Sequence, residues 1–410
     1  MARTVAEIPG GARITDFISL GVISEKIPRS EVQRVLEETG RKSRRRRKLP
    51  MHVMVYYVIA LALYMEVSYG EVLRCLVEGL EWLGLPVKSI RTAAKSGISQ
   101  ARTRLGVEPL RKLYRELVAP VATPETRGAW YREWRLVSLD GSTLDVADLP
   151  RNEAAFGRPG SSRGKSGFPQ IRFVSLVECG THVLFGARHG PYETSETTLA
   201  RQVLGAGLSP GMLCLADRHF FGYELWKQAV STGADLLWRI KKNLVFTCTR
   251  RLPDGSYLSK VYPSSQDRKH DRRGMAVRVI EYELEGIEDA EPLYRLVTTL
   301  LDPLEAPAPE LAALYHERWE IETAFDELKT HLRGPRIVLR SRTPDLVAQE
   351  FYGLLLAHYA VRGLMHEAAL RADLDPDTVS FVHSVRVVRR KLPRYAAFPP
   401  SGRSGKSGAP

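Results

Sequence analysis

The chain has 410 residues, which is enough for two or three domains, each with its own hydrophobic core. Hydrophobic residues make up 44% and charged residues 26%, as in ordinary globular proteins. The longest apolar run, Val53 to Met65, is shorter than the roughly 20 residues of a membrane span, and no signal peptide is apparent. The four cysteines show no short spacing, so neither a disulfide framework nor a zinc site is indicated. We therefore expect a cytoplasmic protein without a membrane partner.

The net charge of +13 at pH 7 is concentrated at the two ends of the chain. Residues 1–125 carry 21 Lys and Arg against 13 Asp and Glu, and residues 373–410 carry 7 against 3. The residues between these segments are almost neutral. A neutral centre with basic ends suits a polyanionic ligand held mainly by the flanking parts. The alternative is charge that serves solubility alone.

Residues 1–125 form the first predicted domain, which is all-helical. We expect helices over Ser30–Glu38, Met51–Tyr64, Tyr69–Leu83 and Ser99–Tyr114, the last with Arg102, Arg104, Arg111 and Lys112 exposed. A run of cations from Arg41 to Lys48 lies between the first two helices, and its centre is Arg44, Arg45, Arg46 and Arg47. This run is basic enough to contact several DNA phosphates, and the alternative is a solvated linker.

From Trp130 the hydrophobic period changes from helical to strand-like. A short strand, Arg135–Leu139, ends at Asp140, and a loop rich in Gly, Ser, Arg and Lys follows over Asn152–Gly167. Further on, the pattern predicts a hairpin, a helix, a strand that delivers Asp217, a second helix and another strand. These elements are Gln170–Val177 with Thr181–Ala187, Ser195–Leu204, Met212–Ala216, Tyr223–Ser231 and Asp235–Lys241. The order predicts a mixed sheet with helices on it.

Residues 243–300 interrupt this rhythm and predict a small β-rich insertion, with strands over Val277–Leu284 and Tyr294–Leu300. Two helices, Leu311–Leu332 and from Leu346 to Leu370, close the catalytic core, which we place at residues 126–372. Residues 373–410 form a basic C-terminal segment with a disordered tail.

The helix Leu311–Leu332 carries an unusual group of polar residues. At about 100° per residue, Tyr315, Arg318, Glu322 and Lys329 share one face beside the apolar stripe that would be buried. A carboxylate flanked by two cations and a phenol therefore lies at the edge of the core. The alternatives are a routine surface ion pair between Arg318 and Glu322, a snorkelling Lys329 and a half-buried Tyr315.

Two more carboxylates, Asp140 and Asp217, each follow an apolar strand-like run. Carboxylates at the ends of adjacent strands, joined by Glu322 from a helix on the sheet, can converge on two divalent ions about 3.5–4 Å apart. Such a pair of ions performs phosphoryl transfer. Either aspartate alone is more often the start of a turn, so the prediction depends on the three acids together. Arg318, Lys329 and the Tyr315 hydroxyl would then hold phosphates of the strand being cut.

These residues resemble the DDE transposases of the insertion sequence 4 group. That group carries its third acid in a Tyr-x2-Arg-x3-Glu-x6-Lys motif, which Tyr315, Arg318, Glu322 and Lys329 match at every spacing. The Asp-Gly-Ser at Asp140 and the Asp-Arg-x-Phe at Asp217, with Arg218 as its basic residue, also match. The resemblance covers roughly residues 15–370, including the basic run and the Ser-Gln-Ala-Arg segment that begins at Ser99.

The resemblance implies an α/β protein with an RNase H-like mixed-sheet catalytic core and a β-rich insertion, preceded by an all-helical N-terminal DNA-binding domain. It further implies Asp140, Asp217 and Glu322 as catalytic metal ligands, with two Mg²⁺ (or Mn²⁺) ions per active site. Double-stranded DNA, as element ends and target, would be the partner, bound by a homodimer or a higher synaptic complex. The protein would be nucleoid-associated.

In related elements a tryptophan in the insertion stacks on a flipped base when excision passes through a hairpin. In this chain Tyr294, followed by Arg295, stands at the corresponding distance before Tyr315. We therefore treat base stacking by Tyr294 as a hypothesis, beside the alternative of a strand aromatic in the core.

The favoured function is metal-dependent cleavage at terminal inverted repeats, followed by transfer of the freed 3′-OH into target DNA. One alternative is a catalytically silent or repurposed DNA-binding protein derived from a transposase. Another is a stand-alone nuclease of the same fold, which would leave the basic N-terminal module unexplained.

Overall fold

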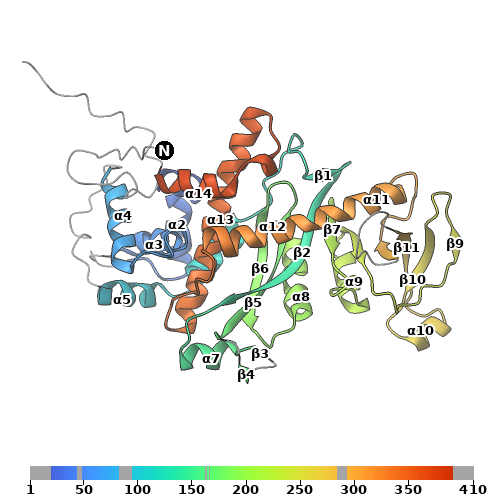
Figure 1. The fold of residues 1–410 in the computed structure, drawn as a ribbon, viewed down its shortest axis with the longest axis horizontal. Coiled ribbons are helices and arrows are strands. Elements are labelled where there is room, and N and C mark those ends of the chain that lie inside the picture. Colours follow the sequence, from blue (N-terminus) through green and yellow to red (C-terminus); the bar gives the residue numbers. More distant parts are fainter. Residues whose placement is uncertain are drawn as a thin grey trace, which may run out of the picture.

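The computed structural model describes residues 20–43, 49–82, 95–161, 164–165, 167–283 and 293–390. The cations Arg44, Arg45, Arg46 and Arg47, and the tail from residue 391 onward, lie outside these residues. In Figure 1 helices from the start of the chain occupy one end of the molecule, a twisted sheet the middle and the insertion the other end. Within the described residues, none of the helices has the length and apolar character needed to span a membrane.

A mixed β-sheet forms the centre of the molecule, as predicted. Its middle strand, β2 (Trp134–Asp145), pairs antiparallel with β5 (Gln170–Glu178), and β5 pairs antiparallel with β6 (Val183–Pro191). On its other side β2 pairs in parallel with β7 (Met212–Ala216), which pairs in parallel with β8 (Asp235–Arg239). The spatial order β6-β5-β2-β7-β8 is that of an RNase H-like core.

Strand β2 is longer than predicted, and Asp140 lies within it rather than at its end. The parallel pairing with β7 stops at Leu139 opposite Ala216, whereas the antiparallel pairing with β5 continues through Asp140 opposite Ser175 to Asp145. Pairing with β5 keeps β2 extended past Gly141. Glycine within a strand is usually destabilising, which is why the sequence predicted an earlier end. Asp140 therefore stands where the parallel part of the sheet ends.

The β-rich insertion extends the same sheet. Strand β12 (Tyr294–Thr298) pairs antiparallel with β8, and the sheet then continues outward through three further strands. These are β11 (Met275–Tyr282), β10 (Tyr257–Val261) and β9 (Arg250–Arg251). The helix α10 (Ser265–Lys269) follows β10, and the short strand β1 (Trp130–Tyr131) pairs with β2.

The helices at the start of the chain largely follow the predicted ranges. They are α1 (Leu20–Lys26), α2 (Arg29–Glu38), α3 (Met51–Leu63), α4 (Tyr69–Trp82), α5 (Lys95–Leu105) and α6 (Glu108–Leu117).

The single helix predicted over Ser99–Tyr114 is wrong. Gly106 has a left-handed φ of 70° that ends α5, and Pro109 stands in the first turn of the new helix α6. The predicted exposure of Arg102 is also wrong, because its side chain is buried and donates hydrogen bonds to Gln349, Ser341 and the Leu346 carbonyl.

The segment predicted as a loop over Asn152–Gly167 begins inside a helix, α7 (Pro150–Phe156), and contains the short pair β3 (Gly160–Ser161) and β4 (Gly164–Lys165). Two further helices follow strands of the core, α8 (Glu196–Gly207) after β6 and α9 (Tyr223–Val230) after β7. Ser195 caps α8, since its hydroxyl accepts the Thr198 N–H.

A long helix, α13 (Pro344–Ala372), joins the N-terminal helices to the sheet (Figure 1). It packs tightly on α3: a Cβ added at Gly353 would meet the Val58 carbonyl oxygen at 2.8 Å. One hydrophobic core cluster therefore runs from α1 to the last helix, α14 (Phe381–Arg390), which follows the 3-10 turn η4 (Pro376–Thr378). The domain boundaries at 125/126 and 372/373 stay predictions.

The motif helix is continuous in space but changes its winding three times. It begins as α11 (Ala308–Leu314), tightens to the 3-10 turn η2 (Tyr315–Trp319), returns to α12 (Glu320–Asp326) and widens to the π-helix η3 (Glu327–Leu332). The prediction of one regular α-helix is therefore wrong in its geometry. Departures of this kind inside helices frequently mark functional sites.

Candidate active site

Two of the three predicted acids line one open cavity of about 360 Å³ between β2 and the motif helix. The residues around it come from the Asp-Gly-Ser stretch of β2 and from α12 and η3. They are Asp140, Gly141, Ser142, Glu322, Phe325, Asp326, Lys329 and Thr330. The helix lies against the sheet through the contact of Phe325 with Phe173, whose ring centroids are 5.2 Å apart. Residues some 180 positions apart in sequence thus meet, as the sequence predicted.

The Arg318 guanidinium lies between two of the acids. Its Nη1 is 3.6 Å from Asp140 Oδ2, and its Nη2 donates a hydrogen bond of 3.3 Å to Glu322 Oε1. Arg318 is buried, whereas the Glu322 side chain is 47% exposed. The contact with Glu322 is therefore more than a surface i,i+4 pair, because the same cation also compensates Asp140.

Asp140 is a partly buried carboxyl group near two other acids and one cation. Burial raises the pKa of its carboxyl to about 6, the Gly141 N–H and the Arg318 charge oppose that rise, and the charges of Glu196 and Asp217 add to it. The Gly141 N–H donates a 2.7 Å hydrogen bond to Asp140 Oδ1. Asp140 and Asp217 are therefore close enough to feel each other's charge. A site that gathers carboxylates in this way favours a bound cation.

Asp217 directly follows β7, at the strand end where the sequence predicted it. The Tyr315 hydroxyl donates a 3.2 Å hydrogen bond to the carbonyl of Ala216, the last residue of that strand. Tyr315 is buried, and burial raises its pKa well above the usual range. The hydroxyl that we expected to hold a phosphate is thus occupied inside the protein, where it ties the motif helix to the strand of Asp217.

Lys329 reaches from the π-helical turn to the opposite wall of the cavity. Its Nζ donates a 3.0 Å hydrogen bond to the Ser142 hydroxyl. Burial lowers the pKa of the Lys329 ammonium, and the neighbouring Arg333 charge adds to this effect. Asp145, at the end of β2, accepts a hydrogen bond from Gln170. The amine of Lys329 therefore lies where a phosphate entering the cavity would meet it.

Glu196 is a fourth carboxylate at this site, and the sequence analysis missed it. It is the first residue of α8, and a Cβ added at Gly141 would lie 2.8 Å from its Cδ. A side chain at position 141 would therefore displace the Glu196 carboxyl group from its place beside Asp140. The sequence offered one weak signal, an acid directly after the capping residue Ser195, but this is common in the first turn of any helix.

Two predicted DNA contacts lie elsewhere. Neither Tyr294 nor Arg218 is among the described residues that line the cavity. The Tyr294 ring in β12 stacks on Tyr282 with centroids 5.4 Å apart, and the Arg239 guanidinium lies 4.5 Å from its centroid. Tyr294 is half-buried, so base stacking by its ring stays a prediction.

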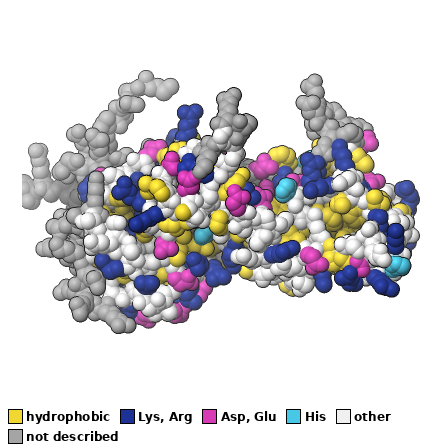
Figure 2. Space-filling model, turned by 90° about the horizontal axis from the view of Figure 1, so that it is seen from below, with side chains coloured by type: hydrophobic (Ala, Val, Ile, Leu, Met, Phe, Trp, Pro, Cys, Tyr) yellow, Lys and Arg dark blue, Asp and Glu magenta, His cyan; other side chains and the backbone are white. Residues whose placement is uncertain are grey.

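Lys and Arg side chains recur along the whole face seen in Figure 2, over the core and over the insertion. The insertion contributes a set of exposed cations around β8, β9 and α10. They are Lys241, Lys242, Arg250, Arg251, Arg268, Lys269 and Arg272. Exposed cations gathered on one part of a protein are the usual electrostatic surface for a nucleic-acid backbone.

Comparison with known proteins identifies the family. Residues 17–115 match the family described as insertion element 4 transposase N-terminal, and residues 133–360 match the family described as transposase DDE domain. The chain is 30% identical over 364 residues to the transposase InsG for insertion sequence element IS4 of Escherichia coli (strain K12), covering 88% of this chain and 80% of the relative. It is 26% identical over 227 residues to the putative transposase InsZ of the same strain, covering 54% and 71%.

Among solved structures, the cryo-EM structure of the piggyBac transposase synaptic complex with hairpin DNA aligns with a TM-score of 0.46 and 11% identity. That alignment covers 95% of this chain and 81% of the other. The resemblance noted in the sequence is confirmed by the two family matches, and a DDE domain implies dependence on a divalent metal. The chain belongs to the insertion element 4 family of DDE transposases and is a DNA transposase.

Proposed function

We propose that Asp140, Asp217 and Glu322 are the catalytic metal ligands of this transposase. The observation that carries the proposal is the position of Arg318, which contacts Asp140 and Glu322 at one cavity although the two acids are far apart in sequence. Asp217 joins them through its electrostatic effect on Asp140 and through the bond from Tyr315 to Ala216. The Glu322 side chain is nearly half exposed and could exchange its contact with Arg318 for a bound cation.

The donor set fits two Mg²⁺ or Mn²⁺ ions, since all three acids offer hard carboxylate oxygens. The negative charges of Asp217 and Glu196 near the partly buried Asp140 support a divalent cation there. Such ions, when bound, would activate the attacking oxygen and stabilise the leaving oxygen. Asp140, within β2, and Asp217, directly after the neighbouring strand β7, supply a rigid part of the ligand set, and Glu322 supplies the adjustable part.

Lys329 and Arg318 would hold phosphates of the strand being cut. Lys329 projects into the cavity, and the buried guanidinium of Arg318 lies at its edge. Both groups would be drawn from their present partners, Ser142 and the acids, to the stronger charge of a phosphate. Arg218, directly after Asp217, and the exposed cations of the insertion would guide the flanking duplex. The arginines 44–47 stay proposed contacts from the N-terminal domain.

The reaction that these groups support is hydrolysis at the end of the element followed by strand transfer. Water attacks the phosphodiester, and the 3′-OH that leaves becomes the nucleophile for target DNA at the same acids. Because the leaving group is the next nucleophile, no covalent enzyme intermediate is required. We further propose that the protein acts on terminal inverted repeats as a homodimer or higher synaptic complex.

A cleavage-and-joining assay tests this function. Full-length protein, Mg²⁺ or Mn²⁺ and labelled DNA carrying the flanking repeats are mixed, with Glu322→Gln as the inactive variant. Glu310→Gln is the matched control, because that carboxylate lies on the same helical path but pairs with Tyr131 and Arg132 away from the cavity. Cutting and joining should be lost by at least a thousandfold in Glu322→Gln alone.

Two outcomes would contradict the proposal. Binding to the repeat ends without cutting at either metal would indicate a catalytically silent DNA-binding protein. Cutting without preference for the repeats and without joining would indicate a nuclease.

A further inference from the structure

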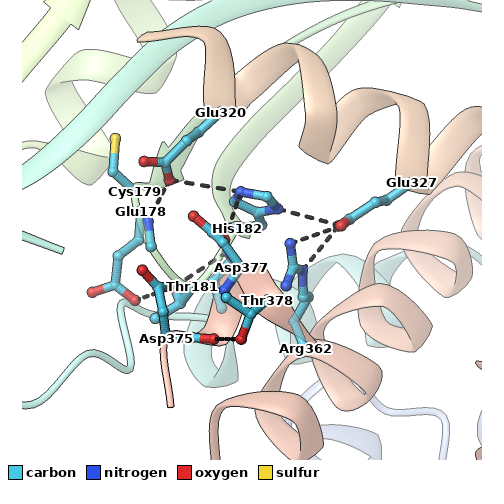
Figure 3. A network of polar contacts seen from close by, with 12 residues as sticks. Glu178, Cys179, Thr181, His182, Glu320, Glu327, Arg362, Asp375, Asp377 and Thr378 are labelled. Atoms are coloured by element: carbon cyan, nitrogen blue, oxygen red, sulfur yellow. Dashed lines mark hydrogen bonds and ion pairs between the residues drawn. The ribbon is translucent and has the colours of Figure 1, made fainter. Parts of the chain in front are cut away.

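A second group of potential metal ligands lies outside the catalytic cavity. His182 comes from the turn between β5 and β6, Glu320 is the first residue of α12, and Asp377 lies in η4 (Figure 3). One ligand atom from each lies within 4.8 Å of those of the other two. We propose that these three residues bind a first-row transition-metal dication of the Zn²⁺ class.

The His182 ring is oriented by a carboxylate on its far side. Arg362 donates two hydrogen bonds, of 2.9 and 2.7 Å, to the two oxygens of Glu327. Glu327 Oε1 in turn lies 3.3 Å from His182 Nδ1. A carboxylate at this position fixes the tautomer with the proton on Nδ1, which leaves the lone pair on Nε2. The arrangement of carboxylate, histidine and open ring nitrogen is the one that metal-binding histidines commonly show.

His182 Nε2 points at two carboxylates without forming a hydrogen bond to either within the described part of the chain. It lies 3.1 Å from Asp377 Oδ1 and 3.6 Å from Glu320 Oε2, and its side chain is only 4% exposed. A buried lone pair without a hydrogen bond is unfavourable, and it repels the carboxylate oxygens whenever these are charged. A cation among the three atoms turns that repulsion into coordination. The alternative is an imidazolium, and the test below separates the two.

The backbone conformation at His182 is consistent with a functional role for this residue. Its φ of 55° is left-handed, a conformation that costs energy for a residue other than glycine. Glu320 is also anchored, because its Oε2 accepts a hydrogen bond from the Gly180 N–H. The β5–β6 turn therefore carries the His182 imidazole and also fixes the Glu320 carboxyl group through the Gly180 N–H. Asp377, with 33% of its side chain exposed, brings the group into contact with solvent.

This site differs from the catalytic one in place and in chemistry. None of its three residues is among the described residues that line the catalytic cavity. An imidazole nitrogen with two carboxylates favours Zn²⁺, Co²⁺ or Mn²⁺ over Mg²⁺, whereas the catalytic donors are all oxygen. Glu320 and Glu322 are two residues apart on a helix, so they do not share a face. A metal here would tie the β5–β6 turn and the α13–α14 connection to the start of α12, and so position Glu322.

Metal binding by full-length protein tests the proposal. Asp140→Asn, Asp217→Asn and Glu322→Gln are combined so that the catalytic acids no longer contribute, and the protein is titrated with Co²⁺ at pH 7.5. We expect one Co²⁺ per chain, seen by its visible absorption and displaced by Zn²⁺. Adding Asp377→Asn, or His182→Asn, should weaken binding at least tenfold; asparagine tolerates the left-handed backbone at 182. Asp373→Asn, an exposed carboxylate in the same connection, is the control and should change nothing.

Three results would overturn the proposal. One is the absence of Co²⁺ binding in the protein that lacks the catalytic acids. Another is Co²⁺ binding that persists in the Asp377→Asn variant. Because the Asp377 side chain is partly exposed, this substitution should not disturb folding. The third is an NMR signature at pH 7.5, with the metal added, of a His182 ring protonated on both nitrogens. None of these results depends on cleavage, so they are independent of the proposed function.

Discussion

The Tyr315 hydroxyl donates a hydrogen bond to the main-chain carbonyl of Ala216, the residue that precedes Asp217. One member of the motif helix therefore holds the strand end that carries another of the acids. We expect Tyr315→Phe to lower the rate of cleavage about tenfold while DNA affinity stays unchanged, because the buried carbonyl loses its partner and Asp217 is less well placed. Single-turnover cleavage and DNA-binding isotherms measure the two quantities separately.

If Tyr315 instead held a phosphate, Tyr315→Phe would weaken DNA binding and the salt dependence of that binding would change. Tyr359→Phe serves as the matched control, since it removes a hydroxyl from α13 rather than from the motif helix.

Neutralising Asp140 should stabilise the metal-free protein. Burial raises the pKa of this carboxyl from 3.8 to about 6 in the folded state, so folding favours its protonated form. The resulting stabilisation is present below pH 4 and is lost as pH rises through 6. In chelator at pH 7.5, Asp140→Asn should therefore unfold with a free energy about 1–3 kcal/mol above wild type, and the gap should close toward pH 4. Urea denaturation at several pH values measures it.

An Asp140→Asn variant that is no more stable than wild type at pH 7.5 would show that the Arg318 ion pair, 3.6 Å long, outweighs the cost of burial. The same variant should be inactive in cleavage. Its stability and its activity would then report separately on the cost of burying the Asp140 carboxylate and on its role in catalysis.

Glu196→Gln should weaken metal binding at the catalytic acids. The side chain packs on Gly141 and its charge raises the pKa of Asp140, so the carboxylate belongs to the electrostatic environment of the site. Removing one negative charge at constant shape should weaken Mn²⁺ binding about tenfold, or about 1.4 kcal/mol. Calorimetric titration of full-length protein measures this. Glu193→Gln, an exposed acid just upstream, should leave the affinity unchanged, and equal affinities in both variants would exclude the assigned role for Glu196.

The buried pair of Glu327 and Arg362 should be important for the stability of the folded protein. Their side chains are 7% and 2% exposed, and the guanidinium binds both carboxylate oxygens. Arg362→Met would leave the carboxylate without its cation, at a cost of about 3–5 kcal/mol in the free energy of unfolding. Adding Glu327→Gln should recover part of that loss.

Arg127→Met is the control for this pair, because its ion pair with Asp373 is exposed and should contribute less than about 1 kcal/mol. A cost for Arg362→Met as small as that of the control would mean that water reaches Glu327.

Local patterns predicted much of this fold. Both ends of strand Met212–Ala216 were predicted correctly. A short apolar run that stops at a charged residue such as Asp217 marks the limits of a buried strand without reference to the rest of the fold. The helix motif brought Glu322 and Lys329 to the cavity with Asp140 because spacing along one helix survives moderate changes of winding. These predictions needed only the neighbouring residues.

Features that depend on distant partners were beyond the sequence. Arg102 resembles a solvent-facing cation until Gln349 and Ser341, more than 200 residues away, accept its hydrogen bonds. The extension of β2 through Asp140 depends on β5, which lies on the other side of a helix in the sequence. Likewise His182 and Asp377 share no spacing that would have linked them before the chain folded.

The pairing of β12 with β8 has a mechanical consequence. Because the insertion is hydrogen-bonded to the strand beside β7, it cannot swing on a hinge relative to Asp217 without breaking sheet hydrogen bonds. A DNA end bound by the insertion would therefore be held at a fixed distance from the catalytic acids. Movement that admits a second DNA molecule would then be easier on the opposite side, where the motif helix rests on the sheet through side-chain contacts such as that of Phe325 with Phe173.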